Sequence, residues 1–309
     1  MHLKRGAWIA TVPLVLIACG GDAEPEADAA NETPPLEAIA VTGVGFMTPE
    51  SVLHDEEADV YLVSNINGPP VDEDGNGFIS RVAPTGDVIA LKWIDGAAEG
   101  VTLHAPKGMA IVGDTLYVTD VTTVRMFDRR SGAPIGDIPV VGSDFLNDLH
   151  PGADGELYVT DSGMTAGDGG LVPTGNDGVY VIRGRDVEML ASGDELGRPN
   201  GIHTVGPTLW VVSFGANSLY SIGEDGKATE VMLPTGGLDG LEVANDGRLL
   251  ISSWEGQAVY GGTPDGGFEV IVPDVESPAD IGYDETRNHL LIPLFMKDEV
   301  RIIPLGDTM

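Results

Sequence analysis

From about residue 41 onward, apolar runs of four to six residues alternate with turns rich in Gly, Asp, Asn and Pro. No stretch keeps the 3.6-residue period of an amphipathic helix, so the pattern predicts a nearly all-β domain of short strands. Asp-Gly pairs at 154–155, 225–226, 246–247 and 265–266 mark the expected hairpin turns.

One short apolar phrase recurs along this region and gives the architecture. The steps between successive copies are 56, 41, 52, 40 and 41 residues, and a period near forty is typical of four-stranded β-propeller blades. One blade cannot bury both of its faces, so the sequence predicts a six-bladed β-propeller closed around a central tunnel. The two longer steps predict insertions around 66–78 and 162–178 that overhang one tunnel mouth. The copies begin at Tyr61, Tyr117, Tyr158, Trp210, Leu250 and Leu291.

The beginning of the chain has the pattern of an export signal. A basic start precedes an apolar run from Ala7 to Ala18, which is too short for a permanent membrane span. The run ends in Leu-Ile-Ala-Cys, which resembles the lipobox of bacterial lipoproteins and implies cleavage before a lipidated Cys19. We therefore expect a signal peptide at 1–18 and a cell-envelope protein, lipid-anchored on the periplasmic or extracellular face of a bacterial membrane. An ordinary cleaved signal with a chance Cys is the alternative.

Cys19 is the single Cys of the chain, which excludes an internal disulfide. Residues 20–40 carry six acids and no base, which predicts a flexible acidic tether from 19 to 40 ahead of a propeller at 41–309. Over the whole chain, Lys+Arg 16 against Asp+Glu 49 gives a net charge of −33. A chain this acidic repels nucleic acid and anionic lipid, so we expect neither as a partner, apart from the membrane that the lipid anchor enters.

Four of the expected blade entries carry a hard oxygen ligand at an equivalent point: Glu50, Asn147, Asn200 and Asp239. The start of each innermost strand of a propeller faces the axis, so these side chains should converge at one tunnel mouth. Two carboxylates and two amide oxygens suit Ca²⁺ or another divalent cation. No His or Cys stands at these positions, which argues against zinc or copper.

Around these residues the chain resembles the SMP-30/gluconolactonase/luciferin-regenerating-enzyme family, over roughly residues 42–306. The family's metal ligands are a Glu of the first blade, an Asn of an Asn-Asp pair, an Asn of a Pro-Asn-Gly and an Asp of an Asp-Gly. The resemblance implies a hydrolase whose ion polarises a lactone carbonyl or a phosphoryl oxygen and activates a water. It also implies that Asp239 is both a ligand and the general base. The corresponding residues are Glu50, Asn147-Asp148, Pro199-Asn200-Gly201 and Asp239-Gly240.

The chain departs from the family at two points. Phe145 stands where sugar-lactone-hydrolysing members carry an Arg that grips hydroxyls, and the first-blade motif reads Glu50-Ser51-Val52 instead of Glu-Gly-Pro. An apolar ring at 145 favours a less polar substrate. We expect Phe145, Lys107 and Asp280 to line the substrate pocket, although Asp280 with Glu242 could instead hold a second, structural ion.

A different calcium motif is incomplete. Residues 72–77 imitate the first half of an EF-hand loop, but Ala83 stands where the bidentate Glu belongs, which favours an acidic turn.

The sequence therefore favours a membrane-tethered, calcium-dependent hydrolase of the lactonase or esterase kind that acts on a small molecule. The alternative is a binding or scaffold propeller in the style of NHL-repeat proteins with a structural ion, and a weaker one is a strictosidine-synthase-like propeller. The pattern predicts no oligomeric state.

Overall fold

The computed structural model describes residues 37–223 and 226–306. By contacts the chain divides into Met1–Pro35 and Leu36–Met309, and every described residue belongs to the second unit. The expected signal peptide at 1–18, Cys19 and nearly all of the acidic tether lie outside the described residues.

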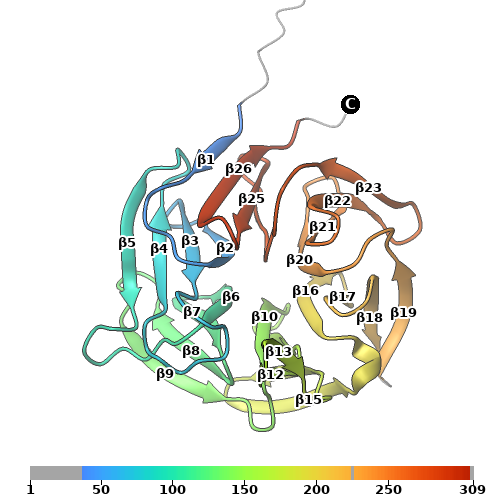
Figure 1. Ribbon diagram of the computed structural model, residues 1–309, viewed down its shortest axis with the longest axis horizontal. Coiled ribbons are helices and arrows are strands. Elements are labelled where there is room, and N and C mark those ends of the chain that lie inside the picture. The colour runs from blue at the N-terminus through green and yellow to red at the C-terminus, as the bar shows by residue number, and fades with distance from the viewer. Residues whose placement is uncertain (1–36, 224–225, 307–309) are drawn as a thin grey trace, which may run out of the picture. The chain divides into compact units, whose positions relative to one another are not determined.

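The described residues form six four-stranded antiparallel sheets arranged radially around an axis, which confirms the all-β, six-bladed propeller (Figure 1). The first three blades, from the axis outward, are β2 (Pro49–Asp55), β3 (Val60–Asn65), β4 (Phe78–Val82) and β5 (Val88–Asp95); β6 (Pro106–Val112), β7 (Thr115–Asp120), β8 (Thr123–Asp128) and β9 (Pro134–Pro139); and β10 (Leu146–Pro151), β11 (Leu157–Asp161), β14 (Gly178–Arg183) and β15 (Asp186–Ser192).

The last three blades follow the same order, preceded by the short 3-10 helix η1 (Asp194–Leu196). They are β16 (Pro199–Val205), β17 (Thr208–Ser213), β18 (Ser218–Gly223) and β19 (Gly226–Met232); β20 (Leu238–Val243), β21 (Leu249–Ser253), β22 (Ala258–Thr263) and β23 (Gly267–Val272); and β24 (Gly282–Asp284), β25 (His289–Leu294), β26 (Glu299–Pro304) and β1 (Ile39–Val41).

The ring is closed by a strand from near the beginning of the chain. β1 pairs antiparallel with β26, with Ile39 opposite Ile302, and so supplies the outer strand of the sixth blade. The propeller therefore begins at Ile39 rather than at residue 41. Because the first and last segments share one sheet, opening the ring requires breaking this pairing as well as the packing between blades.

The recurring phrase forms the second strand of every blade. These strands are the most buried, as Tyr61, Val118, Val211 and Ile251 show, all with no solvent exposure. Apolar side chains from neighbouring blades interlock, for example Leu62 of β3 with Leu116 of β7. The core is thus a set of interfaces between blades, which is why no single repeat would be stable alone.

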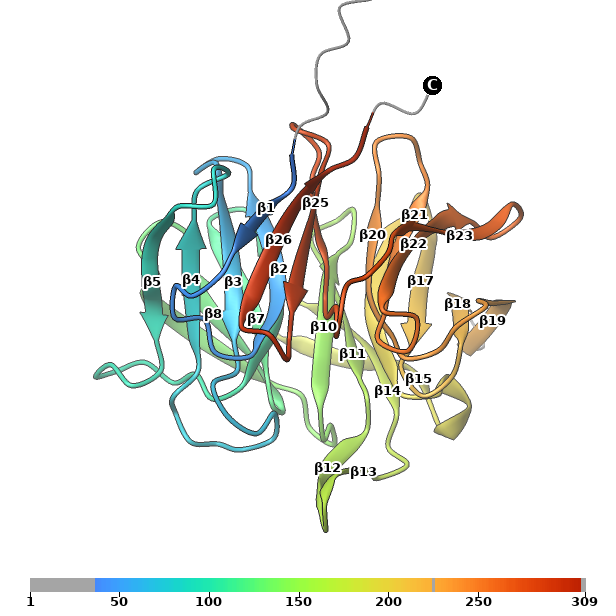
Figure 2. The ribbon, with the colours of Figure 1, turned by 45° about the horizontal axis from the view of Figure 1, so that its top comes forward.

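The two insertions lie at the same mouth of the tunnel, as expected. The first runs from β3 to β4, and the second contains the hairpin of β12 (Met164–Gly167) and β13 (Gly170–Pro173), which projects from one face in Figure 2. In the first insertion Asp74 accepts hydrogen bonds from the backbone and side chain of Asn76, so the EF-hand-like stretch is an internally bonded turn. Within the described residues, no helix has the length and hydrophobicity to cross a membrane.

Candidate functional site

A β-bulge at the start of five of the six inner strands turns one side chain toward the axis. In the first blade Pro49 pairs with Asn65 and Val52 pairs with Val63, so Glu50 and Ser51 together face one residue of β3. Bulges of this kind re-aim side chains and are frequent beside active sites. The same irregularity occurs in β6, β10, β16 and β20. The first bulge residues are Glu50, Lys107, Asn147, Asn200 and Asp239.

All five of these side chains line one cavity of about 130 Å³ at the mouth beneath the insertions. The structure thus brings together the four oxygen ligands that the sequence predicts, from blades one, three, four and five. Each of the four residues is at most 5% exposed. Blade two contributes Lys107 at the equivalent point. In blade six the equivalent residue is Ala279, which directly follows the bridge between Pro278 and Leu294.

Each predicted ligand keeps one buried oxygen that has no hydrogen-bond partner within the described chain. They are Glu50 Oε2, Asn147 Oδ1, Asn200 Oδ1 and Asp239 Oδ1. A buried acceptor left unpaired costs about 1–3 kcal/mol, so four in one small cavity call for a common partner. Hard oxygens from two carboxylates and two amides are a donor set that fits Ca²⁺.

Neighbouring side chains determine which atoms face the cavity. The Asn147 amide donates Nδ2–H to Ser162 Oγ at 3.0 Å, and Ser162 donates to the Pro199 carbonyl at 2.7 Å. This chain fixes the amide with its oxygen inward. Across residues 37–223 and 226–306, no three His, Cys, Asp or Glu side chains form a metal cluster, and the set at this mouth contains only two such side chains.

The electrostatics of the cavity also favour a cation. Burial, and then the charge of Asp239, raise the pKa of Glu50 well above its usual value. Burial, and then the charge of Asp280, do the same to the pKa of Asp239, although the Trp254 indole N–H opposes the shift. A divalent cation between the two carboxylates would favour their charged forms.

Lys107 is fully enclosed beside these acids. Its Nζ donates to the Ala105 carbonyl at 3.1 Å and lies 4.4 Å from the centroid of the Phe145 ring. Burial lowers its pKa to about 8, against the opposing charge of Glu50. The sequence placed Lys107 near the pocket without recognising that it occupies the ligand position of blade two. The alignment of Pro106-Lys107-Gly108 with Pro199-Asn200-Gly201 carried that signal.

An aromatic wall covers the oxygen set. Trp254 stands between Phe214 and Phe295, with ring centroids 5.7 and 5.2 Å away, and Phe145 lines the same cavity. The sequence alone did not place Trp254 or Phe295 in the pocket. The signal that could have found the wall is position, because Phe214, Trp254 and Phe295 each directly follow a second strand, β17, β21 and β25.

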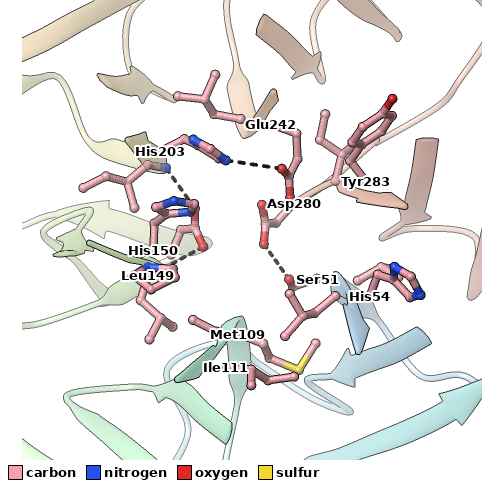
Figure 3. Close-up of a pocket in the computed structure, with 18 of the residues that line it drawn as sticks. Ser51, His54, Met109, Ile111, Leu149, His150, His203, Glu242, Asp280 and Tyr283 are labelled. Carbon is pink, nitrogen blue, oxygen red and sulfur yellow. Dashed lines mark hydrogen bonds and ion pairs between the residues drawn. The ribbon is translucent and has the colours of Figure 1, made fainter. Parts of the chain in front are cut away.

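Asp280 lies elsewhere, although we expected it beside Phe145 and Lys107. It follows Ala279, so it is the second residue after the bridge and corresponds to Ser51 of the first blade. Its carboxylate accepts a hydrogen bond from the Ser51 hydroxyl and lines a separate cavity of about 460 Å³ further along the tunnel (Figure 3). Glu242, the other acid considered for a second ion, lines that cavity too.

Comparisons with known proteins bear on the fold. No protein-family model matches the sequence, and no curated protein does. The structure is similar to a gluconolactonase from Xanthomonas campestris, with a TM-score of 0.65 and 18% identity over 87% of this chain and 89% of that one.

Two other solved structures show how widely the architecture is used. A luciferin-regenerating enzyme is similar with a TM-score of 0.62 and 13% identity, covering 87% of this chain and 96% of that one. A virginiamycin B lyase from Staphylococcus aureus has a TM-score of 0.61 and 13% identity, covering 87% and 99%. One of these neighbours is named a gluconolactonase and another a lyase, so one architecture carries different reactions. The comparisons therefore show the fold of this chain, and its function has to be argued from its own residues.

Proposed function

We propose that the protein is a calcium-dependent hydrolase of lactones or related esters with an apolar body. The observation that carries this proposal is the convergence of four buried, unpaired oxygens in one cavity, on Glu50, Asn147, Asn200 and Asp239. Two structural neighbours carry gluconolactonase names, which supports the same reaction class at low sequence identity.

The four oxygens would hold the ion, and bound Ca²⁺ would supply Lewis-acid polarisation of the ester carbonyl. Asp239 is the residue we assign as general base. Trp254 Nε1–H donates to its Oδ2 at 2.6 Å, which leaves Oδ1 toward the cavity. A carboxylate oxygen has two lone pairs, so one lone pair of Oδ1 would face the ion and the other would take a proton from the attacking water. As the C–O bond of the ester breaks, the same proton returns to the leaving alkoxide.

The rest of the wall selects the substrate. Phe145, Phe214, Trp254 and Phe295 present ring faces and edges instead of hydroxyl-binding groups. Lys107 carries further N–H donors beside this wall, suited to one substrate oxygen. The cavity therefore favours an aryl or alkyl lactone over a polyhydroxylated sugar lactone.

The test uses the EDTA-stripped full chain in a calorimetric titration with Ca²⁺, followed by hydrolysis of dihydrocoumarin and gluconolactone with and without the ion. We expect one site, lost in Asp239→Asn and Asn200→Ala, with dihydrocoumarin the better substrate. Asp265→Asn, an exposed acid in the turn between β22 and β23, is the matched control. Binding without turnover would support the scaffold alternative with a structural ion, and absence of binding would refute both.

We also propose that the chain is lipidated at Cys19 and held on the outer side of a bacterial membrane. The support is the sequence alone, namely the Leu-Ile-Ala-Cys motif after a short apolar run. Metabolic labelling with a palmitate analogue should mark the wild type and not Cys19→Ser. Equal membrane retention of an unlabelled Cys19→Ser variant would contradict the assignment.

A further inference from the structure

The larger cavity of about 460 Å³ lies in the tunnel beyond the oxygen set, and its volume is that of a small-molecule site (Figure 3). Three of its side chains come from the same inner strands that position the predicted ligands. His150, His203 and Glu242 each stand three residues after a ligand position, on β10, β16 and β20. The bulge that turns one side chain toward the first mouth thus leaves another facing this cavity.

Two acceptors face each other across a gap on its wall. His203 Nδ1 lies 2.8 Å from the Thr204 carbonyl, which can only accept, so the proton of the neutral ring is on Nδ1. Burial lowers the pKa of His203 to about 4, so the ring is neutral near pH 7 and Nε2 carries a lone pair. This nitrogen lies 3.6 Å from Glu242 Oε2, too far for a direct hydrogen bond.

Asp280 adds a third acceptor. Its Oδ2 accepts from the Ser51 hydroxyl, whereas Oδ1 receives no hydrogen bond from any residue that the structure describes. The residue is 6% exposed, and Figure 3 shows its carboxylate pointing into the cavity beside that of Glu242. Burial, and then the charge of Asp280, raise the pKa of Glu242, and a cation bound between the two acids would favour their charged forms.

The cations nearby are already engaged. Arg129 lines the rim, but its guanidinium is paired with Asp55 and Glu57. Of the other acids that line the cavity, Glu56 and Glu285 are exposed to solvent. Asp148 is buried and accepts backbone N–H groups from Leu149 and Ile202 at 2.7 and 2.8 Å. The negative charge that lacks a compensating partner is therefore concentrated at Glu242 and Asp280.

A metal ion suits this place poorly. The His150 and His203 rings pack against each other, with centroids 3.8 Å apart and an interplanar angle of 37°. Among the residues that the structure describes, no three His, Cys, Asp or Glu side chains form a cluster that could hold a metal ion. A volume of about 460 Å³ also exceeds what a bare ion needs.

We propose that this cavity binds a primary organic ammonium. Its three N–H donors match the three acceptors, His203 Nε2, Glu242 Oε2 and Asp280 Oδ1. The apolar part of the ligand contacts the opposite wall, formed by Met109, Ile111 and Leu149 (Figure 3). The site requires no hydrolytic activity at the first mouth.

The probe is 2-phenylethylamine, titrated calorimetrically at pH 7 into the full chain with saturating Ca²⁺. We expect one site, with affinity at least tenfold lower in Glu242→Gln and for the neutral isostere 2-phenylethanol. Glu269→Gln, an exposed acid on the outer strand β23, should bind as the wild type does. If Glu242→Gln unfolds, Asp280→Asn, which keeps an acceptor for Ser51, takes its place.

Four results would overturn the proposal: no amine binding at millimolar concentration, equal binding of the alcohol, full affinity in folded Glu242→Gln, or loss of binding in Asp239→Asn with Glu242→Gln unaffected. The last would move the amine to the first mouth. Zn²⁺ binding that disappears in His203→Ala, without amine binding, would assign the cavity to a metal instead.

Discussion

Trp254 donates its indole N–H to Oδ2 of Asp239 at 2.6 Å, and Oδ1 of the same carboxylate is left buried and unpaired. The two residues belong to one blade, Asp239 in the bulge of β20 and Trp254 directly after β21. One side chain thus forms part of the aromatic wall and also orients the residue assigned as ligand and base. Residues that hydrogen-bond a metal ligand orient that ligand, and their replacement commonly lowers the affinity for the metal.

Trp254→Phe should therefore weaken Ca²⁺ binding about 10–100-fold while keeping an aromatic ring in the wall. The loss has a directional cause, since the variant lacks the indole N–H that holds Oδ2 of Asp239 and so orients the carboxylate. Calorimetric titration measures it. Trp93→Phe is the matched control, because Trp93 stacks under Arg81 far from the oxygen set. Equal affinities in wild type and Trp254→Phe would show that the indole only packs.

Calcium should also stabilise the fold, since the native state gathers the four oxygens and the unfolded chain separates them. At 100 times the dissociation constant, linkage predicts about 2.7 kcal/mol of added stability. Thermal unfolding in Ca²⁺ and in EDTA measures the difference as a shift of Tm. In Asp239→Asn the shift should vanish. A calcium-dependent Tm that persists in this variant would place the ion elsewhere.

Phe145→Arg tests how the wall selects substrate. The family resemblance implies an Arg at this position in sugar-lactone hydrolysis, and Phe145 lies in the cavity 4.4 Å from the Lys107 ammonium. We expect kcat/KM for dihydrocoumarin to fall and the ratio of gluconolactone to dihydrocoumarin to rise about tenfold, a change of about 1.4 kcal/mol. Phe145→Leu should lower the first activity without raising the ratio. If both variants behave alike, residue 145 does not select the substrate.

The blades could be predicted from the sequence because each second strand is buried on both faces and reads as an unbroken apolar run, as at Tyr61 and Leu250. The closure of the ring by β1 could not be predicted from the sequence. Its three residues are too few to show a period, and its partner β26 lies more than 250 positions away. The oxygen set was visible because four bulge residues are short and polar. Lys107 broke that chemical pattern and was not recognised as equivalent.

The position of Asp280 shows a different limit. Hydrophobic pattern and turn residues place a blade entry to within a residue or two, whereas the bulge makes one residue face the first mouth and the next face away from it. Ala279 and Asp280 fall on either side of that division. The aromatic wall likewise depends on three separate loops meeting in space, so no local motif marks it.

Gly201→Ala should disturb the oxygen set through the backbone. A Cβ at Gly201 would lie 2.4 Å from the Asp239 carbonyl oxygen and 2.7 Å from the Leu241 nitrogen, both backbone atoms of the next blade. Relief of this clash must separate Asn200 from Asp239. We expect a loss of about 1–3 kcal/mol of stability and weaker Ca²⁺ binding, from urea unfolding and calorimetry. Gly306→Ala, where a Cβ meets nothing within 4 Å, is the control. Unchanged calcium affinity would mean that the two blades can move apart without cost to the site.

His203 should make stability depend on acid. Burial lowers its pKa in the folded protein to about 4 from the usual 6.5, so the unfolded chain binds a proton first as the pH falls. The contribution of neutral His203 to the free energy of unfolding is fully present above pH ~6.5 and is lost as the pH falls toward ~4. By pH ~4.5 this loss amounts to about 2–3 kcal/mol. Burial raises the pKa of Asp280 to about 7, which gives the opposite slope, so the comparison must be between wild type and His203→Asn. Urea unfolding at several pH values measures the free energy of unfolding of both proteins. Between pH ~7.5 and ~4.5 it should fall by about 2–3 kcal/mol more in the wild type than in His203→Asn. Parallel curves for the two proteins would mean that His203 takes up its proton in the folded state as readily as in the unfolded chain.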